Sequence, residues 1–455
     1  MANKNIIVLL KIFKGDLNPF DETALETALR LKEEYDVTVL AMAPLAFQDI
    51  LKNLTRLGCK AILLSDMGYA QSDTIATANI LSALLKRLNP ELIFAGRKSM
   101  DGDTAQVPMM LSELLGYRLV NRVINEENGL LKLRNGQTER LEDHTIITFE
   151  KFRPLRSPSI FSKVSDVEVM TNDDLNLPKE RIGLLGSRTK VVRSYQNEED
   201  KRFVTFINYE QLDEVIAREL NKENKDVSAQ LRQQIPLIYY VGDIEDVAKR
   251  YAKEVSHLAI EDKTTDEAIN VIKDKDIKII LWEEADKIKE LACRVAIKLD
   301  VGLCADCTNI KEENGEIVIT RPALSGDVMA DIVCTSKIAM ATIRKSQSES
   351  NVAITVGKGA IDYLPQIQKL ADKYQAEIYC SRPLADSGLM DYSKQVGLTG
   401  RSINPKICIV IGVSGAVQHI VGINKSKTII AININKKEKI YDYVNYGIVM
   451  DAKDI

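Results

Sequence analysis

Histidine and tryptophan are scarce in this sequence, which holds three histidines and one tryptophan among 455 residues. Its seven cysteines include the spacing Cys304 to Cys307, but no second such pair and no histidine cluster accompany it. Zinc sites and disulfide frameworks need clustered or paired ligands, so neither is predicted. An odd, scattered set of cysteines is typical of a reducing compartment, and we expect a cytoplasmic protein.

The sequence also lacks a long apolar run and a marked excess of either charge. No stretch is long enough to cross a bilayer, and Met1 to Lys4 lead directly into a strand-like run without a leader. The 61 basic and 65 acidic residues give a net charge of −4, and no basic run is interleaved with aromatic residues. Membrane insertion and nucleic-acid binding are therefore not predicted.

The sequence does contain a repeated alternation of short Ile/Val/Leu runs with amphipathic stretches. Strands that alternate with helices indicate parallel sheets covered on both faces, so the predicted class is α/β. We expect two doubly wound, adenine-nucleotide-binding-like domains followed by a Rossmann-like domain. The predicted bounds are 1–195 for the first domain, 196–230 for a linker with a helical arm, 231–345 for a shortened second domain and 346–455 for the third.

Three stretches depart from simple βα alternation. Residues 122–169 show short alternating runs with Gly turns, which predict antiparallel additions to the first sheet. Residues 186–205 are mostly polar and predict an exposed connection. A charged helix is expected over 209–223.

Three clusters of small residues near the C-terminus suggest a binding site for a large dinucleotide. They are Ser381–Pro383, Gln395–Gly400 and Gly412–His419, and each lies close to an apolar run that predicts a strand. Small residues at strand ends let backbone N–H groups approach a pyrophosphate, and a helix N-terminus favours its charge. One such turn is weak evidence, whereas three in one α/β domain point to a shared ligand.

These clusters resemble the FAD domain of the electron transfer flavoprotein α subunit. Upstream motifs at Ala305–Thr308, Thr320–Ala323 and Met340–Arg344 resemble the same subunit. The N-terminal segments Asn18–Asp21 and Gly96–Val107 resemble the β subunit of the family. The order is β-like, then α-like, which indicates the two subunits fused in one chain.

The resemblance implies FAD in the C-terminal domain, with Arg382, Thr399 and His419 tuning the flavin. A guanidinium near the ring would stabilise negative charge on reduction. A competing interpretation pairs Arg382 with Asp386. The remaining FAD contacts that the resemblance implies are Ser381, Gln395, Val396, Gly397, Leu398, Ser414, Gly415, Ala416, Val417, Gln418, Asn433 and Asp451.

The resemblance also implies a second nucleotide site in the N-terminal domain. FAD is favoured over AMP there, because the loop sequence from Asp101 to Val107 is that of family members with a second FAD. The loop carries two carboxylates, and these are unfavourable beside a phosphate unless backbone N–H groups dominate or the loop contacts a base or ribose. The alternative interpretation of this loop is an acidic surface turn. The residues implied are Asn18, Gly96, Asp101, Gly102, Asp103, Thr104, Ala105, Gln106 and Val107.

The function implied is transfer of electrons between redox partner proteins through FAD, with an acyl-CoA dehydrogenase-type flavoenzyme as a partner. A second FAD would allow electron bifurcation from NADH to ferredoxin or flavodoxin, and NADH oxidation is expected only in that case. Two alternatives stay open at this point. One is a non-redox protein that binds an adenine nucleotide, and the other is a degenerate paralogue of the family.

Overall fold

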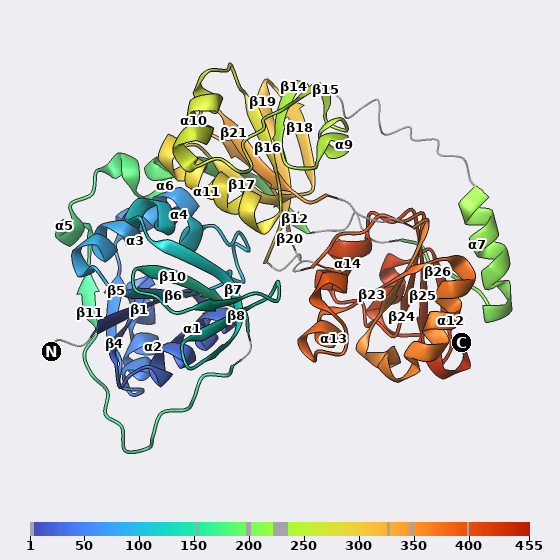
Figure 1. Ribbon diagram of the computed structural model, residues 1–455, viewed down its shortest axis with the longest axis horizontal. Helices are drawn as coiled ribbons and strands as arrows, with labels where there is room; N and C mark the ends of the chain where they lie inside the picture. Colours follow the sequence, from blue (N-terminus) through green and yellow to red (C-terminus); the bar gives the residue numbers. More distant parts are fainter. Residues whose placement is uncertain are drawn as a thin grey trace.

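The computed structural model describes residues 4–151, 153–196, 202–221, 235–324, 328–345, 350–397 and 400–455, which form three α/β units (Figure 1). Leu398 and Thr399, both predicted to contact the flavin, lie outside the described residues. Within the described part, no helix is long and apolar enough to span a membrane. The same part holds no cluster of three or more His, Cys, Asp or Glu side chains suited to a metal ion.

The N-terminal unit confirms the alternation of strands and helices predicted for its first 120 residues. Its strands there are β1 (Lys4–Leu10), β4 (Tyr35–Met42), β5 (Lys60–Leu64) and β6 (Leu92–Gly96), with a small hairpin of β2 (Ile12–Phe13) and β3 (Asp16–Leu17). Its helices are α1 (Pro19–Arg30), α2 (Gln48–Thr55), α3 (Thr74–Leu88) and α4 (Val107–Leu115). The four long strands are parallel and mostly buried, as expected for a sheet with helices on both faces.

The antiparallel additions predicted for 122–169 are only partly correct. Three strands do form an antiparallel extension: β7 (Arg118–Glu127), β8 (Leu130–Leu133) and β9 (Thr138–Arg140). Two others are parallel additions: β10 (Thr145–Phe149), inserted between β6 and β7, and β11 (Glu168–Met170), beside β5. All five residues of β10 are buried, which suits a central parallel strand better than a hairpin edge. The resulting nine-stranded order is β11-β5-β4-β1-β6-β10-β7-β8-β9.

The middle unit combines a parallel sheet with an antiparallel one. The parallel sheet contains β14 (Ile235–Val241), β15 (Ala252–His257), β16 (Ile279–Glu283), β17 (Leu303–Cys307) and β21 (Ala339–Ile343). Its helices are α9 (Glu245–Ala248), α10 (Thr265–Lys273) and α11 (Asp286–Leu299). The antiparallel sheet contains β12 (Thr189–Gln196), β18 (Asn309–Glu313), β19 (Glu316–Ala323) and β20 (Val328–Cys334).

Strand β12 corrects the prediction of an exposed connection over 186–205. Its backbone pairs with β20 from Thr189 to Gln196, so this segment forms one edge of the antiparallel sheet in the middle unit. Most of its side chains are exposed, which removes the apolar alternation that would have revealed a strand. Before β12, the short helices α5 (Asn172–Leu175) and α6 (Gly183–Gly186) complete the N-terminal unit.

The C-terminal unit, orange to red in Figure 1 apart from the green helix over Leu212–Asn221, is a six-stranded parallel sheet flanked by helices. Its strands are β13 (Thr205–Phe206), β22 (Val352–Val356), β23 (Glu377–Cys380), β24 (Ile407–Ile411), β25 (Thr428–Asn433) and β26 (Tyr446–Val449). Its helices are α7 (Leu212–Asn221), α12 (Leu364–Tyr374), α13 (Arg382–Asp386) and α14 (Val417–Ile423). The order β13-β26-β25-β24-β22-β23 places β13 at one edge, and α7 contributes Leu212, Val215 and Ile216 to the core.

The cores join the first two units more closely than the third. One apolar cluster runs from α3 and α4 of the N-terminal unit into α10 and α11 of the middle unit. The C-terminal unit has two clusters of its own. Arg344 of the middle unit donates hydrogen bonds to the carbonyl oxygens of Gly397 at 2.8 Å and Gly400 at 2.9 Å, so polar contacts hold the third unit in place.

Candidate functional site

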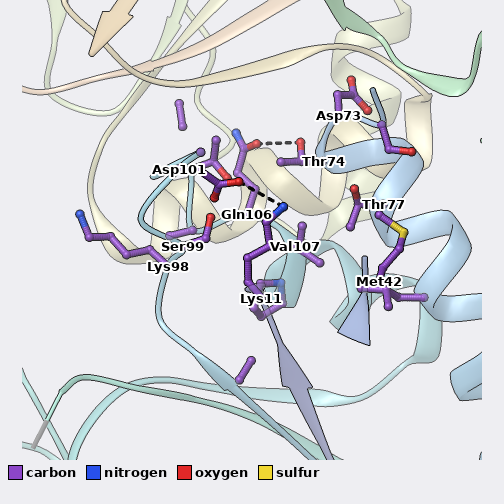
Figure 2. A pocket seen from close by; sticks show the side chains of 18 of the residues that line it. Lys11, Met42, Asp73, Thr74, Thr77, Lys98, Ser99, Asp101, Gln106 and Val107 are labelled. Carbon is purple, nitrogen blue, oxygen red and sulfur yellow. Dashed lines mark hydrogen bonds and ion pairs between the residues drawn. The ribbon is translucent and has the colours of Figure 1, made fainter. Parts of the chain in front are cut away.

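A cavity of about 610 Å³ lies at the carboxyl ends of β1 and β6 (Figure 2). The chain passes from β1 to β4 and β5 on one side of the sheet and then returns to β6 on the other side. Such a reversal of strand order is the place where open parallel sheets bind ligands. Leu10 and Lys11 line the cavity from the end of β1, and Ala95 and Gly96 line it from the end of β6.

The predicted nucleotide loop forms one wall of this cavity. Asp103 and Ala105 adopt left-handed backbone conformations, with φ of 55° and 56°. Alternation of left-handed residues with ordinary ones turns neighbouring N–H groups to a common side, which favours an anion. Helix α4 follows directly at Val107 and adds a helix N-terminus. Eight of the nine predicted residues line the cavity: Asn18, Gly96, Asp101, Gly102, Thr104, Ala105, Gln106 and Val107.

Both carboxylates of the loop are paired with lysines. Lys11 Nζ lies 3.2 Å from Asp101 Oδ2, as Figure 2 shows, and Lys98 pairs with Asp103. Burial alone would raise the pKa of Asp101, but Lys11 and hydrogen bonds from Ser99 and Gly102 leave it lowered. Asp103 does not line the cavity, because its side chain is buried against Lys98. The repulsion expected between two acids and a phosphate is thereby offset.

Asp21 ties the two strand ends together beneath the cavity. It accepts hydrogen bonds from the backbone N–H of Lys11 at 2.7 Å and of Gly96 at 3.0 Å, and from Asn18 Nδ2 at 2.9 Å. Burial raises the pKa of Asp21 to about 7 in spite of these bonds. A Cβ atom on Gly96 would lie 2.2 Å from Asp21 Oδ1, so only glycine fits at this strand end.

Asn18 supplies an acceptor suited to a nucleotide. Its Nδ2 donates to Asp21 and to the Lys98 carbonyl oxygen, while its buried Oδ1 has no hydrogen-bond partner within the described part of the chain. A ribose hydroxyl or the amino group of adenine could donate to this atom. The apolar walls and the few converging polar groups fit an adenine nucleotide.

The middle unit closes the cavity. Gln106 accepts a hydrogen bond from Thr74 Oγ1 at 2.9 Å and donates one to the Leu303 carbonyl oxygen at 3.1 Å. Arg321 on β19 donates to the carbonyl oxygen of Gly102 at 2.7 Å. The two units therefore build this site together.

Several lining residues were not predicted from the sequence. They come from the end of β4, the start of α3 and the strands of the middle unit. Two signals were available in the sequence. Met42 ends an apolar run that predicts a strand, and Thr74 and Thr77 follow the helix-capping residue Asp73. No local signal marks Leu303, because its place depends on packing between units. The residues concerned are Leu40, Met42, Gln71, Thr74, Thr77, Leu303, Cys304 and Ala305.

The C-terminal clusters also meet at the carboxyl ends of parallel strands. Ser381 follows β23, Gly412 to Gln418 follow β24, and Asn433 ends β25. Strand order reverses between β22 and β24, so this edge is a topological switch point as well. A Cβ atom on Gly357, which follows β22, would lie 2.2 Å from the Gly412 carbonyl oxygen. The two loops therefore pack closely, and Gly412 to Gln418 are held at the carboxyl edge of the sheet.

Arg382 pairs with the carboxylate of the competing interpretation and also contacts the N-terminal unit. Its Nε donates to Asp386 Oδ2 at 3.1 Å, as in the competing interpretation, and its guanidinium carbon lies 5.6 Å from the centre of the Phe20 ring. Phe20 belongs to the N-terminal unit, so Arg382 stands where the two units face each other. Its side chain is 31% exposed, which leaves donor atoms accessible to a ligand.

His419 is buried at the start of α14, with Nε2 3.3 Å from Thr355 Oγ1. Burial lowers the pKa of His419 to about 4, opposed by a hydrogen bond to the backbone of Val396. The imidazole is therefore neutral at pH 7 and carries a single N–H, so a hydrogen bond to the Val396 backbone and one to a ligand are alternatives.

The remaining predicted FAD contacts divide by exposure. Gln395 is buried and contacts Arg134 of the N-terminal unit. Asn433 donates to the Val413 carbonyl oxygen at 3.0 Å, and Asp451 accepts from the Lys453 N–H at 3.1 Å. Ser414, Ala416 and Gln418 are exposed, Val417 and Asp451 are partly buried, and Ser381, Val396, Gly397 and Gly415 are buried. Exposed hydroxyl and amide groups are donors that suit a pyrophosphate.

Comparison with known families matches about two thirds of the chain, over residues 8–131 and 244–424. Residues 8–131 and 244–368 each match the electron transfer flavoprotein domain. Residues 347–424 match the electron transfer flavoprotein FAD-binding domain.

Individual relatives match different parts of the chain. The chain is 35% identical over 197 residues to electron transfer flavoprotein subunit beta of Clostridium acetobutylicum, covering 40% of this chain and 76% of that protein. It is 31% identical over 248 residues to electron transfer flavoprotein subunit alpha of Thermoanaerobacterium thermosaccharolyticum, covering 44% of this chain and 71% of that protein. It is 31% identical over 252 residues to lactate dehydrogenase (NAD(+),ferredoxin) subunit LctC of Acetobacterium woodii, covering 44% and 59%.

Proposed function

The chain belongs to the electron transfer flavoprotein family, and we propose that it carries electrons between redox partner proteins through FAD at the carboxyl edge of the C-terminal sheet. The observation that carries this proposal is the convergence of Ser381, Arg382 and the loop from Gly412 to Gln418 at one switch point. Bound FAD would supply reversible one- and two-electron chemistry. The protein would bind it, orient it and set the charge around it.

Each residue at this edge has a distinct part in the proposal. Exposed Ser414 and Gln418 would bind phosphate oxygens, together with the N-terminus of α14. Arg382 would place positive charge beside the ring, with Asp386 moderating that charge. Neutral His419 would donate a hydrogen bond to the ring rather than a full charge.

We propose further that the cavity of about 610 Å³ holds a second adenine nucleotide, with FAD favoured over AMP. Support comes from the switch point, the unpartnered Asn18 Oδ1 and the neutralised carboxylates of the loop. With FAD in both sites, NADH and a ferredoxin or flavodoxin become candidate partners, which the name of the Acetobacterium relative supports. With AMP in the cavity, an acyl-CoA dehydrogenase-type flavoenzyme is the favoured partner.

The competing functions are a non-redox adenine-nucleotide-binding protein and a paralogue that has lost its cofactor. A visible spectrum of the purified full-length protein separates them from the proposed function. We expect the two absorption bands of an oxidised flavin, bleached on reduction. Protein that is colourless, and stays colourless after incubation with FAD, would refute the electron-carrier proposal.

A cavity-filling variant tests the second nucleotide. Thr77 points into the cavity from α3 (Figure 2), and Thr77→Phe would occupy the space of the ligand, whereas Thr77→Val keeps its volume. After denaturation we expect two nucleotides per chain from the wild type and from Thr77→Val, by chromatography of the supernatant. Thr77→Phe should release only the C-terminal FAD. One nucleotide per chain from the wild type would mean that the cavity is empty.

A further inference from the structure

A second, smaller cavity lies where the three units meet. Its volume is about 230 Å³, and it shares Arg97 and Ala105 with the wall of the larger cavity. Its wall is strongly cationic: six basic side chains line it, from all three units. They are Arg97, Arg122 and Arg134 of the N-terminal unit, Lys289 and Arg344 of the middle unit, and Arg401 of the C-terminal unit.

Three of these arginines share one buried carboxylate. Arg97 Nη1, Arg122 Nε and Arg134 Nη1 lie 3.3, 3.5 and 3.1 Å from Glu150 Oε1. All three contacts fall on the same oxygen of Glu150. One carboxylate balances the charge of one guanidinium. The three arginines and Glu150 together therefore carry a net positive charge, and these side chains are largely buried.

The neighbouring cations have carboxylates of their own. Arg122 also reaches Asp286 at 2.8 Å, Arg344 pairs with Asp306 at 2.6 Å, and Lys289 pairs with Glu284. Within the described part of the chain, these ion pairs involve four carboxylates, whereas six cationic side chains line the wall. Burial and the neighbouring arginines lower the pKa of Arg97 to about 10, although Glu150 opposes the change. Burial also lowers the pKa of Arg134, whereas the pKa of Arg122 and of Arg344 is raised, in spite of burial, by Asp286 and Asp306.

We propose that this cavity binds a phosphoryl anion, either a free phosphate or pyrophosphate or the phosphoryl part of a dinucleotide. Planar guanidinium groups donate paired N–H bonds to tetrahedral oxyanions, and Arg is preferred over Lys for this purpose. A doubly charged anion would neutralise the excess charge. The space admits a few heavy atoms between groups that come from all three units.

The bound anion would also couple the C-terminal unit to the rest of the molecule. Two of the arginines that line the cavity also hold this unit. Arg344 donates to Gly397 and Gly400, while Arg134 contacts Gln395 and its guanidinium carbon lies 4.5 Å from the centre of the Tyr392 ring. Neutralising their mutual repulsion would favour the arrangement seen here. This inference goes beyond the proposed redox function and does not depend on it.

Calorimetric titration of the full-length protein, as purified with its nucleotides, tests the site. Inorganic phosphate, pyrophosphate and NADH are titrated separately into wild type, Arg122→Gln, Arg401→Gln and the control Arg140→Gln. Arg401 is exposed, so its replacement keeps the fold, and Arg140 is an exposed arginine that does not line either cavity. We expect one pyrophosphate per chain, bound about tenfold more weakly by each of the first two variants, since each loses a charge-assisted hydrogen bond. Arg140→Gln should match the wild type.

Competition identifies the source of the anion. If NADH displaces pyrophosphate, the phosphoryl group is that of a dinucleotide, and if it does not, the ligand is the free anion. Thr77→Phe should leave the binding of pyrophosphate unchanged, because this variant fills only the larger cavity. Loss of pyrophosphate binding in Thr77→Phe would place the anion in the larger cavity and overturn the proposal. So would the absence of saturable binding by all three ligands, or equal binding by wild type, Arg122→Gln and Arg401→Gln.

Discussion

Arg382 is the residue through which charge is expected to act most directly on the flavin. Removing its guanidinium in Arg382→Ala should lower the flavin reduction potential, because each 1.4 kcal/mol of lost stabilisation is about a tenfold change in the redox equilibrium. Asp386→Ala removes the carboxylate 3.1 Å from Arg382 Nε and should raise the potential. Spectroscopic redox titration measures both. Unchanged potentials in the two variants would place Arg382 away from the ring.

The buried imidazole of His419 makes stability depend on pH. Its pKa is about 4 in the folded chain, against 6.5 for an unperturbed histidine, so the unfolded chain binds more protons between these values. The contribution of His419 to stability is complete above pH 6.5 and is lost as the pH falls, by roughly 3 kcal/mol at pH 4. Urea unfolding at fixed FAD concentration should show this loss in the wild type. His419→Gln should have a flatter profile over the same range, and identical profiles would contradict the assignment.

At the residue scale, the sequence predicted which side chains gather at strand ends but not how their charges are balanced. Eight of the nine residues predicted for the N-terminal site line its cavity, because carboxyl ends of parallel strands necessarily converge. The pairing of Asp101 with Lys11 spans ninety positions and follows from the fold. Nothing local in the sequence could have revealed it.

Among the secondary structure elements, the junction before β12 depends on a single carboxylate. Asp73 caps α3 by accepting from the Ala76 N–H at 2.9 Å, and its other oxygen accepts from the N–H groups of Arg188 at 2.7 Å and Thr189 at 2.9 Å. Asp73→Ala should lower the free energy of unfolding by about 1–3 kcal/mol, through the lost cap and the unsatisfied N–H groups.

Asp73→Asn provides the matched variant. It keeps one acceptor oxygen for the helix cap and gives up the second, so we expect an intermediate loss of stability in chemical denaturation. Equal stability of wild type and Asp73→Ala would show that the start of β12 is held by its pairing with β20 alone.

Elements with a strong periodic signal were predicted best. Helix α11, Asp286–Leu299, carries an apolar stripe of helical period, which is the signal that identifies a helix in a sequence. Strand β12 was missed for the opposite reason: its side chains are mostly exposed, and only backbone pairing with β20 makes it a strand. The direction of β10 was predicted wrongly, because a buried five-residue apolar run does not reveal whether the strand pairs in a parallel or an antiparallel way.

At the scale of the whole molecule, the N-terminal half of the chain contributes elements to all three units. Strand β12 completes a sheet of the middle unit, while β13 and α7 pack on the C-terminal unit. Arg202 donates to Asn445 Oδ1 at 2.6 Å, and Glu219 accepts from Thr428 Oγ1 at 3.1 Å, so this attachment is also polar. The two halves are therefore interlocked as well as covalently joined.

A chain divided after Asn221 should consequently reassemble. Co-expressed fragments 1–221 and 222–455, with a tag on one of them, are expected to purify together in equal amounts. Shortening the first fragment to 1–188 removes β12, β13 and α7 and should greatly reduce recovery of the second. Equal recovery with both versions would mean that the shared core around α4 and α11 is sufficient for association.

The placement of β12 and α7 also governs the order in which this protein can fold during synthesis. Strand β12 leaves the ribosome well before β20, its partner, which begins at Val328. At 5–20 residues per second, the segment between these strands takes roughly 7 to 26 s to translate. Helix α7 waits about as long, since its apolar residues pack on strands that begin at Val352. The nascent chain thus carries an unpaired strand and an apolar helix for many seconds, which makes it a natural client of ribosome-associated chaperones.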